Sequence, residues 1–184
     1  MVGEVIASVA YADLDFLEPE YWDCGEFHIL DVGIQFTTKS GRIFSVSWSC
    51  WDAIEAIEIV ESDIGYFHTP ARDDPDYDGL WVVNKHDLWQ SFIGSRIESC
   101  TLIPMLYEGF ILDPEFTVPI GVRIAANDRA VWLISAKLID SKKKPTLGEI
   151  RIGSDSLVVL FSDEAGEKVG LKLEGPNVVN CPYG

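Results

Sequence analysis

Alternating aspartates in the segment Asp74–Gly79, which reads DPDYDG, match the opening of a calcium-binding loop. In such a loop, alternate carboxylates converge on a hard cation and a glycine permits the sharp turn. The ligands would be Asp74, Asp76 and Asp78, but the twelfth position is Lys85, where a bidentate glutamate is needed. Because the match is incomplete, we expect an acidic, solvated loop, with calcium binding as the alternative.

A cysteine and a histidine occur at a spacing that zinc ligands use, since three residues separate Cys24 from His28. A structural zinc site needs further ligands, and no second pair at such a spacing exists. The other potential ligands are isolated in the sequence: Cys50, His68, His86 and Cys100. Any zinc site would have to be assembled by the fold, so we expect buried cysteines, partly exposed histidines, no metal and no cofactor.

Sequence signatures of nucleophilic and nucleotide chemistry are absent. His86 is next to Asp87, but adjacent residues rarely face each other, and no GxSxG segment supplies a nucleophile. The chain also contains neither HExxH nor a glycine-rich phosphate loop. These absences favour a protein without catalytic activity.

Carboxylates beside a tryptophan keep one enzymatic alternative open. Within nine residues the chain has Glu18, Glu20, Trp22, Asp23 and Glu26. Two carboxylates in an aromatic cleft would suit a glycosidase. The alternative is therefore a small-molecule or carbohydrate-binding module, or a hydrolase, that uses this cluster, although 30 acidic residues also produce such clusters by chance.

The net charge of −16 is concentrated in the first half of the chain. Residues 1–92 hold 18 acidic and 4 basic residues, a net charge of −14, whereas residues 93–184 hold 12 and 10, a net charge of −2. This balance excludes nucleic acid as a partner, because a phosphate backbone requires a basic stripe. A concentrated negative charge either serves solubility or steers a positively charged partner.

Tryptophans are concentrated in the same half: Trp22, Trp48, Trp51, Trp81 and Trp89, against Trp132 alone in the second. Exposed tryptophan surrounded by carboxylates would form an interaction surface for a basic protein; the alternative is that these rings fill a β core. Trp48 and Trp51 lie three positions apart, so on a regular strand they face opposite sides. The predicted partner-binding residues are Trp22, Asp23, Glu26, Trp51, Asp52, Glu55, Glu58, Asp73, Asp74, Asp76, Tyr77, Asp78 and Trp81.

The elements that must position these residues are mostly strands, because apolar residues alternate along short segments joined by turn-rich links. The predicted strands are Val5–Tyr11, Phe27–Thr38, Arg42–Trp51, Gly79–Val83, Ile97–Leu106, Val118–Ala126, Ala130–Ile139, Ser156–Ser162 and Lys168–Leu173. A helix is predicted at Asn84–Gly94, and Asp52–Glu61 fits either a helix or a strand. The class is α+β, mainly antiparallel β built from hairpins with one or two short helices.

A repeat indicates how the single domain, residues 1–184, is organised. LEPEY at 17–21 returns as LDPEF at 112–116, and Gly33–Ser47 aligns without a gap on Gly121–Ser135 at an offset of 88, which places Phe44 on Trp132. We interpret this as a two-fold internal duplication of halves 1–95 and 96–184. The alternative is that amphipathic hairpins resemble one another without common descent.

The cellular compartment follows from cysteine usage and hydropathy. The four cysteines lie far apart with no CxxC, which fits free thiols in a reducing compartment. No apolar run approaches the length of about 20 residues that a membrane helix needs. We expect a cytoplasmic protein without membrane contact.

Three segments carry a resemblance in general pattern: FTTKSGRIFSVSW, HDLWQSFIGSRI and GSDSLVVLFSDEAGEKVGL. Together with the acidity and the tryptophans, they make the chain similar to the immunity proteins encoded beside bacterial polymorphic toxins. The resemblance implies a cytoplasmic inhibitor that binds a toxin domain, often a basic nuclease, and covers its active site with carboxylates that replace phosphate. It assigns no role to an individual residue. A structural adaptor subunit, acidic only for solubility, is the remaining alternative.

Overall fold

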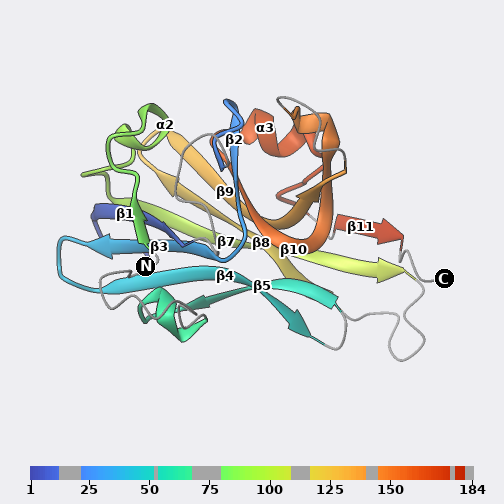
Figure 1. Ribbon diagram of the computed structural model, residues 1–184, viewed down its shortest axis with the longest axis horizontal. Coiled ribbons are helices and arrows are strands. Elements are labelled where there is room, and N and C mark those ends of the chain that lie inside the picture. Colours follow the sequence, from blue (N-terminus) through green and yellow to red (C-terminus); the bar gives the residue numbers. More distant parts are fainter. Residues whose placement is uncertain are drawn as a thin grey trace, which may run out of the picture.

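The computed structural model describes residues 1–12, 22–51, 54–67, 80–108, 117–139, 145–174 and 177–180. Their strands form two sheets (Figure 1). The first has the order β5-β4-β3-β1-β6, with β1 (Ile6–Ala12), β3 (Gly33–Thr38), β4 (Ile43–Trp51), β5 (Ile54–Val60) and β6 (Leu80–Val82). The second has the order β11-β7-β8-β9-β10-β2, with β2 (Phe27–Leu30), β7 (Ile97–Glu108), β8 (Thr117–Ala126), β9 (Arg129–Leu138), β10 (Ile150–Leu160) and β11 (Asn177–Asn180).

Neighbouring strands pair in antiparallel fashion, except β11 with β7. Helices are short: α2 (Asp87–Gln90), α3 (Asp163–Lys168), and the 3-10 turns η1 (Ile64–Tyr66) and η2 (Leu147–Glu149). None of the described helices has the length and apolar character needed to span a bilayer. The expectation of a mainly antiparallel β protein with few short helices is confirmed.

The second sheet is buried on both faces at its centre. In β9, Val131 and Leu133 pack into a core shared with β1 and β3, while Trp132 and Ile134 belong to a second apolar cluster with residues of α3. Successive side chains of a strand point to opposite faces, so each face of β9 needs its own cover. In Figure 1 strands β3, β4 and β5 of the first sheet lie on one side of the second sheet, and α3 lies on the other, where Gly166 packs on the Trp132 ring of β9.

Three boundaries differ from the prediction. The run Phe27–Thr38 is not one strand. The chain bends at Asp31 and Val32 and passes from β2 in the second sheet to β3 in the first. The helix expected at Asn84–Gly94 is regular only over α2. The strand expected at Lys168–Leu173 is wrong: Lys168 ends α3, which begins after Ser162, because the Ser162 side chain accepts a hydrogen bond from the Ala165 N–H.

The two hairpins that suggested a duplication differ in register. In β3–β4, Phe36 is opposite Phe44, whereas in β8–β9, Ile124 is opposite Val131 and not Trp132. The second turn is one residue shorter, and a one-residue shift sends Trp132 to the opposite face from that of Phe44. The gapless alignment therefore does not hold beyond the turn, and the pairing does not show a duplication.

One feature is common to both hairpins, a glycine pressed against the partner strand. A Cβ on Gly33 would lie 2.5 Å from the Val46 carbonyl oxygen, and a Cβ on Gly121 would lie 2.8 Å from Ile134 Cγ2 and 3.0 Å from the Leu133 carbonyl oxygen. Real Cβ atoms do not approach this closely, so both positions require glycine for close contact between the strands.

Candidate functional site at Asp23, His28 and His86

A tight turn places a carboxylate beside a buried histidine. Asp23 and His28 form an isolated antiparallel bridge, so their side chains lie on the same side. The turn between them is closed by a hydrogen bond of 3.0 Å from the Cys24 N–H to the Phe27 carbonyl oxygen, and Gly25 supplies the left-handed backbone with φ of 91°. The Asp23 Oδ1 atom accepts the Gly25 N–H at 2.7 Å, which fixes the carboxylate.

The second histidine comes from the segment between β6 and α2. Asn84 ties this segment to β1, because its Oδ1 accepts the Val9 N–H at 2.7 Å. His86 Nε2 then lies 3.1 Å from Asp23 Oδ2, and His28 Nε2 lies 3.7 Å from Asp23 Oδ1. One ligating atom from each of the three residues lies within 4.8 Å of the others. This trio joins two segments of the chain, the turn from Asp23 to His28 and the segment before α2.

A buried hydrogen-bond chain holds the His28 ring in place. Trp89 Nε1 donates to Tyr11 Oη at 2.5 Å, and Tyr11 Oη is hydrogen-bonded to His28 Nδ1 at 2.5 Å. The Tyr11 hydroxyl proton is therefore directed to Nδ1, which leaves the proton of the neutral imidazole on Nε2. Burial raises the pKa of Tyr11 well above its ordinary value, so the phenol stays protonated.

Aromatic walls close the inner side of the site. The ring of His28 meets those of Trp22 and Phe161 edge to face, each at a centroid distance of 4.8 Å, and its side chain is fully buried. Burial first, and then the neighbouring His86, lowers the pKa of His28 to about 3. The His28 imidazole is therefore neutral at physiological pH.

The outer side of the site reaches solvent. The side chains of Asp23 and His86 are 30% and 21% exposed. Partial burial acts to raise the pKa of Asp23, but the hydrogen bonds with Gly25 and His86 outweigh it and hold the pKa below its ordinary value. The site therefore presents a carboxylate and an imidazole to water in front of a buried neutral imidazole.

Cys24, which the sequence paired with His28 for zinc, does not face this site. It packs partly buried against the apolar cluster that contains Phe27 and Trp132. Burial raises the pKa of the Cys24 thiol to about 11, so the thiolate form is suppressed. The hairpin geometry selects Asp23, five positions before His28, as the neighbour of the histidine.

The predicted partner-binding residues are dispersed among the described parts of the chain. Trp22 is only 2% exposed and offers no area to a partner, Glu26 is exposed in the Asp23–His28 turn, and Trp81 is 38% exposed on β6. Glu55 and Glu58 are half-buried on β5, at the opposite edge of the first sheet from β6. Outside the described residues lie the side chain of Trp51 and all of Asp52, Asp73, Asp74, Asp76, Tyr77 and Asp78, including the calcium candidate.

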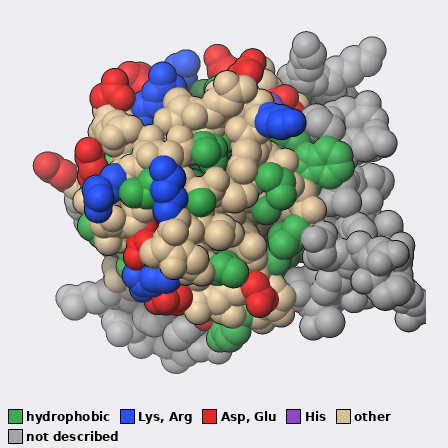
Figure 2. All heavy atoms as spheres, turned by 90° about the vertical axis from the view of Figure 1, so that its left-hand side faces the viewer, with side chains coloured by type: hydrophobic (Ala, Val, Ile, Leu, Met, Phe, Trp, Pro, Cys, Tyr) green, Lys and Arg blue, Asp and Glu red, His purple; other side chains and the backbone are tan. Residues whose placement is uncertain are grey.

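Charges are mixed on the face that Figure 2 shows, where acidic and basic side chains alternate with apolar ones. Among the described residues, Arg42 is the centre of one group of mixed charge: it donates to both carboxylate oxygens of Glu61 at 2.8 and 2.6 Å and to Glu4 Oε1 at 2.9 Å. On this face the described acids do not gather into one negative patch.

A second polar cluster, which the sequence did not predict, lies where α3 meets β8 and β9. Arg123 donates to both Asp163 oxygens at 2.7 and 2.8 Å, and Trp132 Nε1 donates to Asp163 Oδ1 at 2.9 Å. The Arg123 guanidinium holds the pKa of Asp163 below its ordinary value. A Cβ on Gly166 would lie 2.9 Å from the Trp132 ring, so the helix packs directly on the indole.

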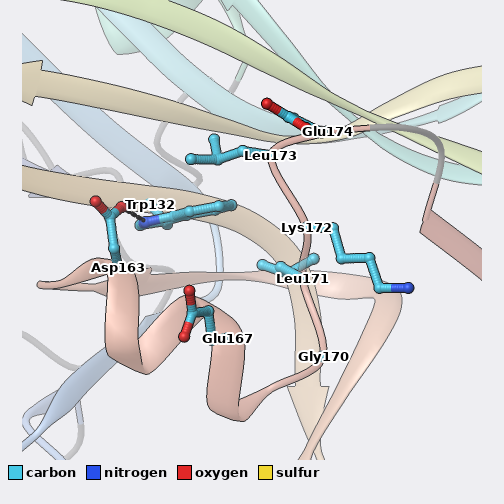
Figure 3. Close-up of a pocket in the computed structure, with 8 residues that line it drawn as sticks. All are labelled: Trp132, Asp163, Glu167, Gly170, Leu171, Lys172, Leu173 and Glu174. Atoms are coloured by element: carbon cyan, nitrogen blue, oxygen red, sulfur yellow. Dashed lines mark hydrogen bonds between the residues drawn. The ribbon is translucent and has the colours of Figure 1, made fainter.

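The pocket beside this cluster has a volume of about 640 Å³ (Figure 3). Its lining comprises Trp132, Asp163, Glu167, Gly170, Leu171, Lys172, Leu173 and Glu174. Trp132 is only 1% exposed, so its ring has no free area on which a sugar could stack. Acidic residues thus line this pocket without the aromatic platform that a carbohydrate site requires.

The residues of the candidate site come from three separate segments, around Tyr11, Asp23–His28 and His86–Trp89. The only sequence signal of their proximity was the spacing of an aspartate and a histidine around a glycine turn. A site assembled in this way leaves no contiguous motif. No protein-family model, curated protein or solved structure matches this chain.

Proposed function

We propose that this protein is a non-enzymatic cytoplasmic binding protein that docks a positively charged protein domain. The observation that carries the proposal is the charge of −14 on residues 1–92 beside −2 on the remainder. A charge of this size costs stability through self-repulsion. A basic partner would relieve that repulsion and bind faster because of long-range attraction.

The described acids of the first half support this role. Glu26, Asp31 and Asp63 are exposed. Of the bases in this half, Arg42 is already shared between Glu4 and Glu61. Arg42 is therefore engaged by two other carboxylates and does not neutralise these exposed acids.

Strand β6 supplies apolar area of the kind that interfaces use. Trp81 is 38% and Val82 61% exposed, and β6 is an edge strand in the described part of the chain. Rigid aromatic area contributes most of the binding energy at many interfaces, while surrounding charge sets the association rate and orientation. The contact we propose is centred on Trp81 and Val82.

The resemblance to immunity proteins is consistent with a partner that is a basic toxin domain whose active site the carboxylates cover. A two-fold duplication of the halves is part of the proposal, and the two meanders, β3–β4–β5 and β8–β9–β10, with the close-packed glycines at 33 and 121, are consistent with it despite the different register. Ligand binding in the pocket beside α3 is the second candidate, but the covered Trp132 ring makes it the less well supported.

The test is capture of a basic protein from a lysate of the source organism, at low and high salt, by wild-type protein and two variants. Trp81→Ala removes the proposed contact, and Leu102→Ser is the control, because Leu102 is 54% exposed on the other sheet. We expect a basic protein that is retained by wild type and L102S, lost with W81A, and released at high salt. Recovery of no basic protein, or equal capture by W81A, would contradict the proposal.

A further inference from the structure

We propose that Asp23, His28 and His86 form a binding site for a divalent transition-metal ion such as Zn²⁺. Two imidazoles and one carboxylate are a donor set that zinc and related metals use, with the remaining coordination positions open to water or another ligand. Ligating atoms of the three side chains lie within 4.8 Å of one another. This inference does not depend on the proposed protein partner.

The distances fit a metal centre after small movements. With metal–ligand bonds of about 2.0 to 2.2 Å, two ligands of a tetrahedral zinc lie about 3.4 Å apart. His86 Nε2 is 3.1 Å from Asp23 Oδ2, and His28 Nε2 is 3.7 Å from Asp23 Oδ1. The most distant ligand atoms of the trio lie within 4.8 Å, so a movement of up to about 1.4 Å would bring all three onto one ion.

An independent feature also points to a ligand at this place. His28 is fully buried, yet its Nε2 atom has no hydrogen-bond partner among the described residues, and neither has Nδ1 of His86. Buried polar atoms are nearly always paired, because an unpaired one forfeits its interaction with water. His28 Nε2 faces Asp23, and coordination of a metal would satisfy it.

The residues behind the ligands have the arrangement that metal sites use to orient histidine. With a metal on His28 Nε2, the imidazole proton moves to Nδ1 and is donated to Tyr11 Oη. Tyr11 Oη has two lone pairs, so it can accept hydrogen bonds from the Nδ1–H and the Trp89 N–H together, while its own hydroxyl proton turns away from Nδ1. The Gly25 N–H, bound to Asp23 Oδ1, orients the carboxylate in the same way.

The burial of the surrounding residues leaves one side of the site open to an ion. Asp23 and His86 are partly exposed, so an ion can enter from solvent, while the rings of Trp22 and Phe161 close the inner side. Cys24 packs against the apolar cluster and is not a ligand. The bound metal would join the 23–28 turn to the segment before α2.

The experiment is calorimetric titration of Zn²⁺ into chelator-treated, untagged full-length protein, repeated with Co²⁺ and visible absorption. We expect one ion per chain and cobalt bands typical of nitrogen and oxygen ligands, without the charge-transfer band of a thiolate. Asp23→Asn and His86→Gln should each weaken binding by more than about tenfold. Both residues are partly exposed, so these variants should fold, which circular dichroism would check.

Matched controls are Glu26→Gln, which makes the same charge change in the same turn, and Cys24→Ser. Both should bind Zn²⁺ as wild type does. Absence of saturable binding, or unchanged binding in D23N and H86Q, would overturn the assignment. A thiolate band that disappears in C24S would equally overturn this ligand set.

Discussion

The two polar clusters, one around His28 and the other around Asp163, use similar parts in different ways. Each combines an aspartate with a tryptophan N–H, and each fastens a short helix to a sheet. In the Asp163 cluster the aspartate accepts two hydrogen bonds from Arg123 and one from Trp132, so both carboxylate oxygens have partners. In the His28 cluster three ring nitrogens, Nε1 of Trp22, Nε2 of His28 and Nδ1 of His86, have no hydrogen-bond partner among the described residues.

This difference separates a structural role from a binding role. An aspartate that is already paired with a permanently charged arginine gains no interaction from a ligand. Unpaired imidazole nitrogens beside a partly exposed carboxylate do gain one, because a ligand supplies the partner that they lack. We therefore assign the Asp163 cluster to the attachment of α3 and the His28 cluster to binding. Three changes would break or sharpen this comparison.

The largest effect is expected for Trp132→Ala, in the structural cluster. Trp132 is 1% exposed and α3 packs on its ring, so its loss should lower the free energy of unfolding by about 3 to 5 kcal/mol. Urea denaturation measures this change. The control, Trp81→Ala, removes an exposed ring and should cost less than about 1 kcal/mol. Equal losses in the two variants would show that Trp132 is not a core anchor.

An intermediate effect is expected from pH, through His28 in the binding cluster. Burial lowers its pKa in the folded protein from 6.5 to about 3, so between these values the unfolded chain binds the extra proton. Stability should therefore fall on acidification, by about 2 kcal/mol between pH 7 and pH 5. The test is to measure the free energy of unfolding of wild type and His28→Gln at both pH values. H28Q should lack the part of the pH-dependent loss that comes from His28. An identical pH dependence in the two proteins would refute the prediction.

The smallest effect is expected for Asp163→Asn. The amide keeps an acceptor for the Trp132 N–H but loses the charge that pairs with Arg123, and the pair is partly exposed, so the cost should be about 1 kcal/mol. The folded pKa of Asp163 is lowered, so its contribution is present above the unfolded pKa of about 3.9 and is lost as pH falls through the folded value. Thermal unfolding should show a larger difference from wild type at pH 7 than at pH 3, with Glu167→Gln as the neutral control on α3.

Some of the fold was predictable because its signals are local. The strands Val118–Ala126 and Ala130–Ile139 match β8 and β9 closely, since apolar alternation and the turn at Asn127, with φ of 57°, suffice to specify a hairpin. The bend at Asp31 and Val32 was missed, because Phe27–Thr38 is apolar enough to read as one strand. The α3 helix was missed because six residues carry too little periodicity to be recognised.

The candidate site was only partly predictable. Asp23 was selected as one member of an acidic surface and His28 as half of a zinc pair, but with Cys24 as the other half. The bridge between Asp23 and His28 corrects the pairing, and His86 approaches them from 58 residues farther along the chain. Trp22 was expected at a surface, yet it forms the wall of the site.

The amino-acid order alone determined the β-rich class, the positions of most hairpins and the excess of negative charge, because period-two hydropathy, turn residues and ionisable groups act locally or simply add. Tertiary structure decided which face Trp132 occupies, which residue is the neighbour of His28, and that His86 completes the trio. Such outcomes depend on strand register and on contacts between distant segments, where a shift of one residue exchanges the buried and exposed sides of a strand.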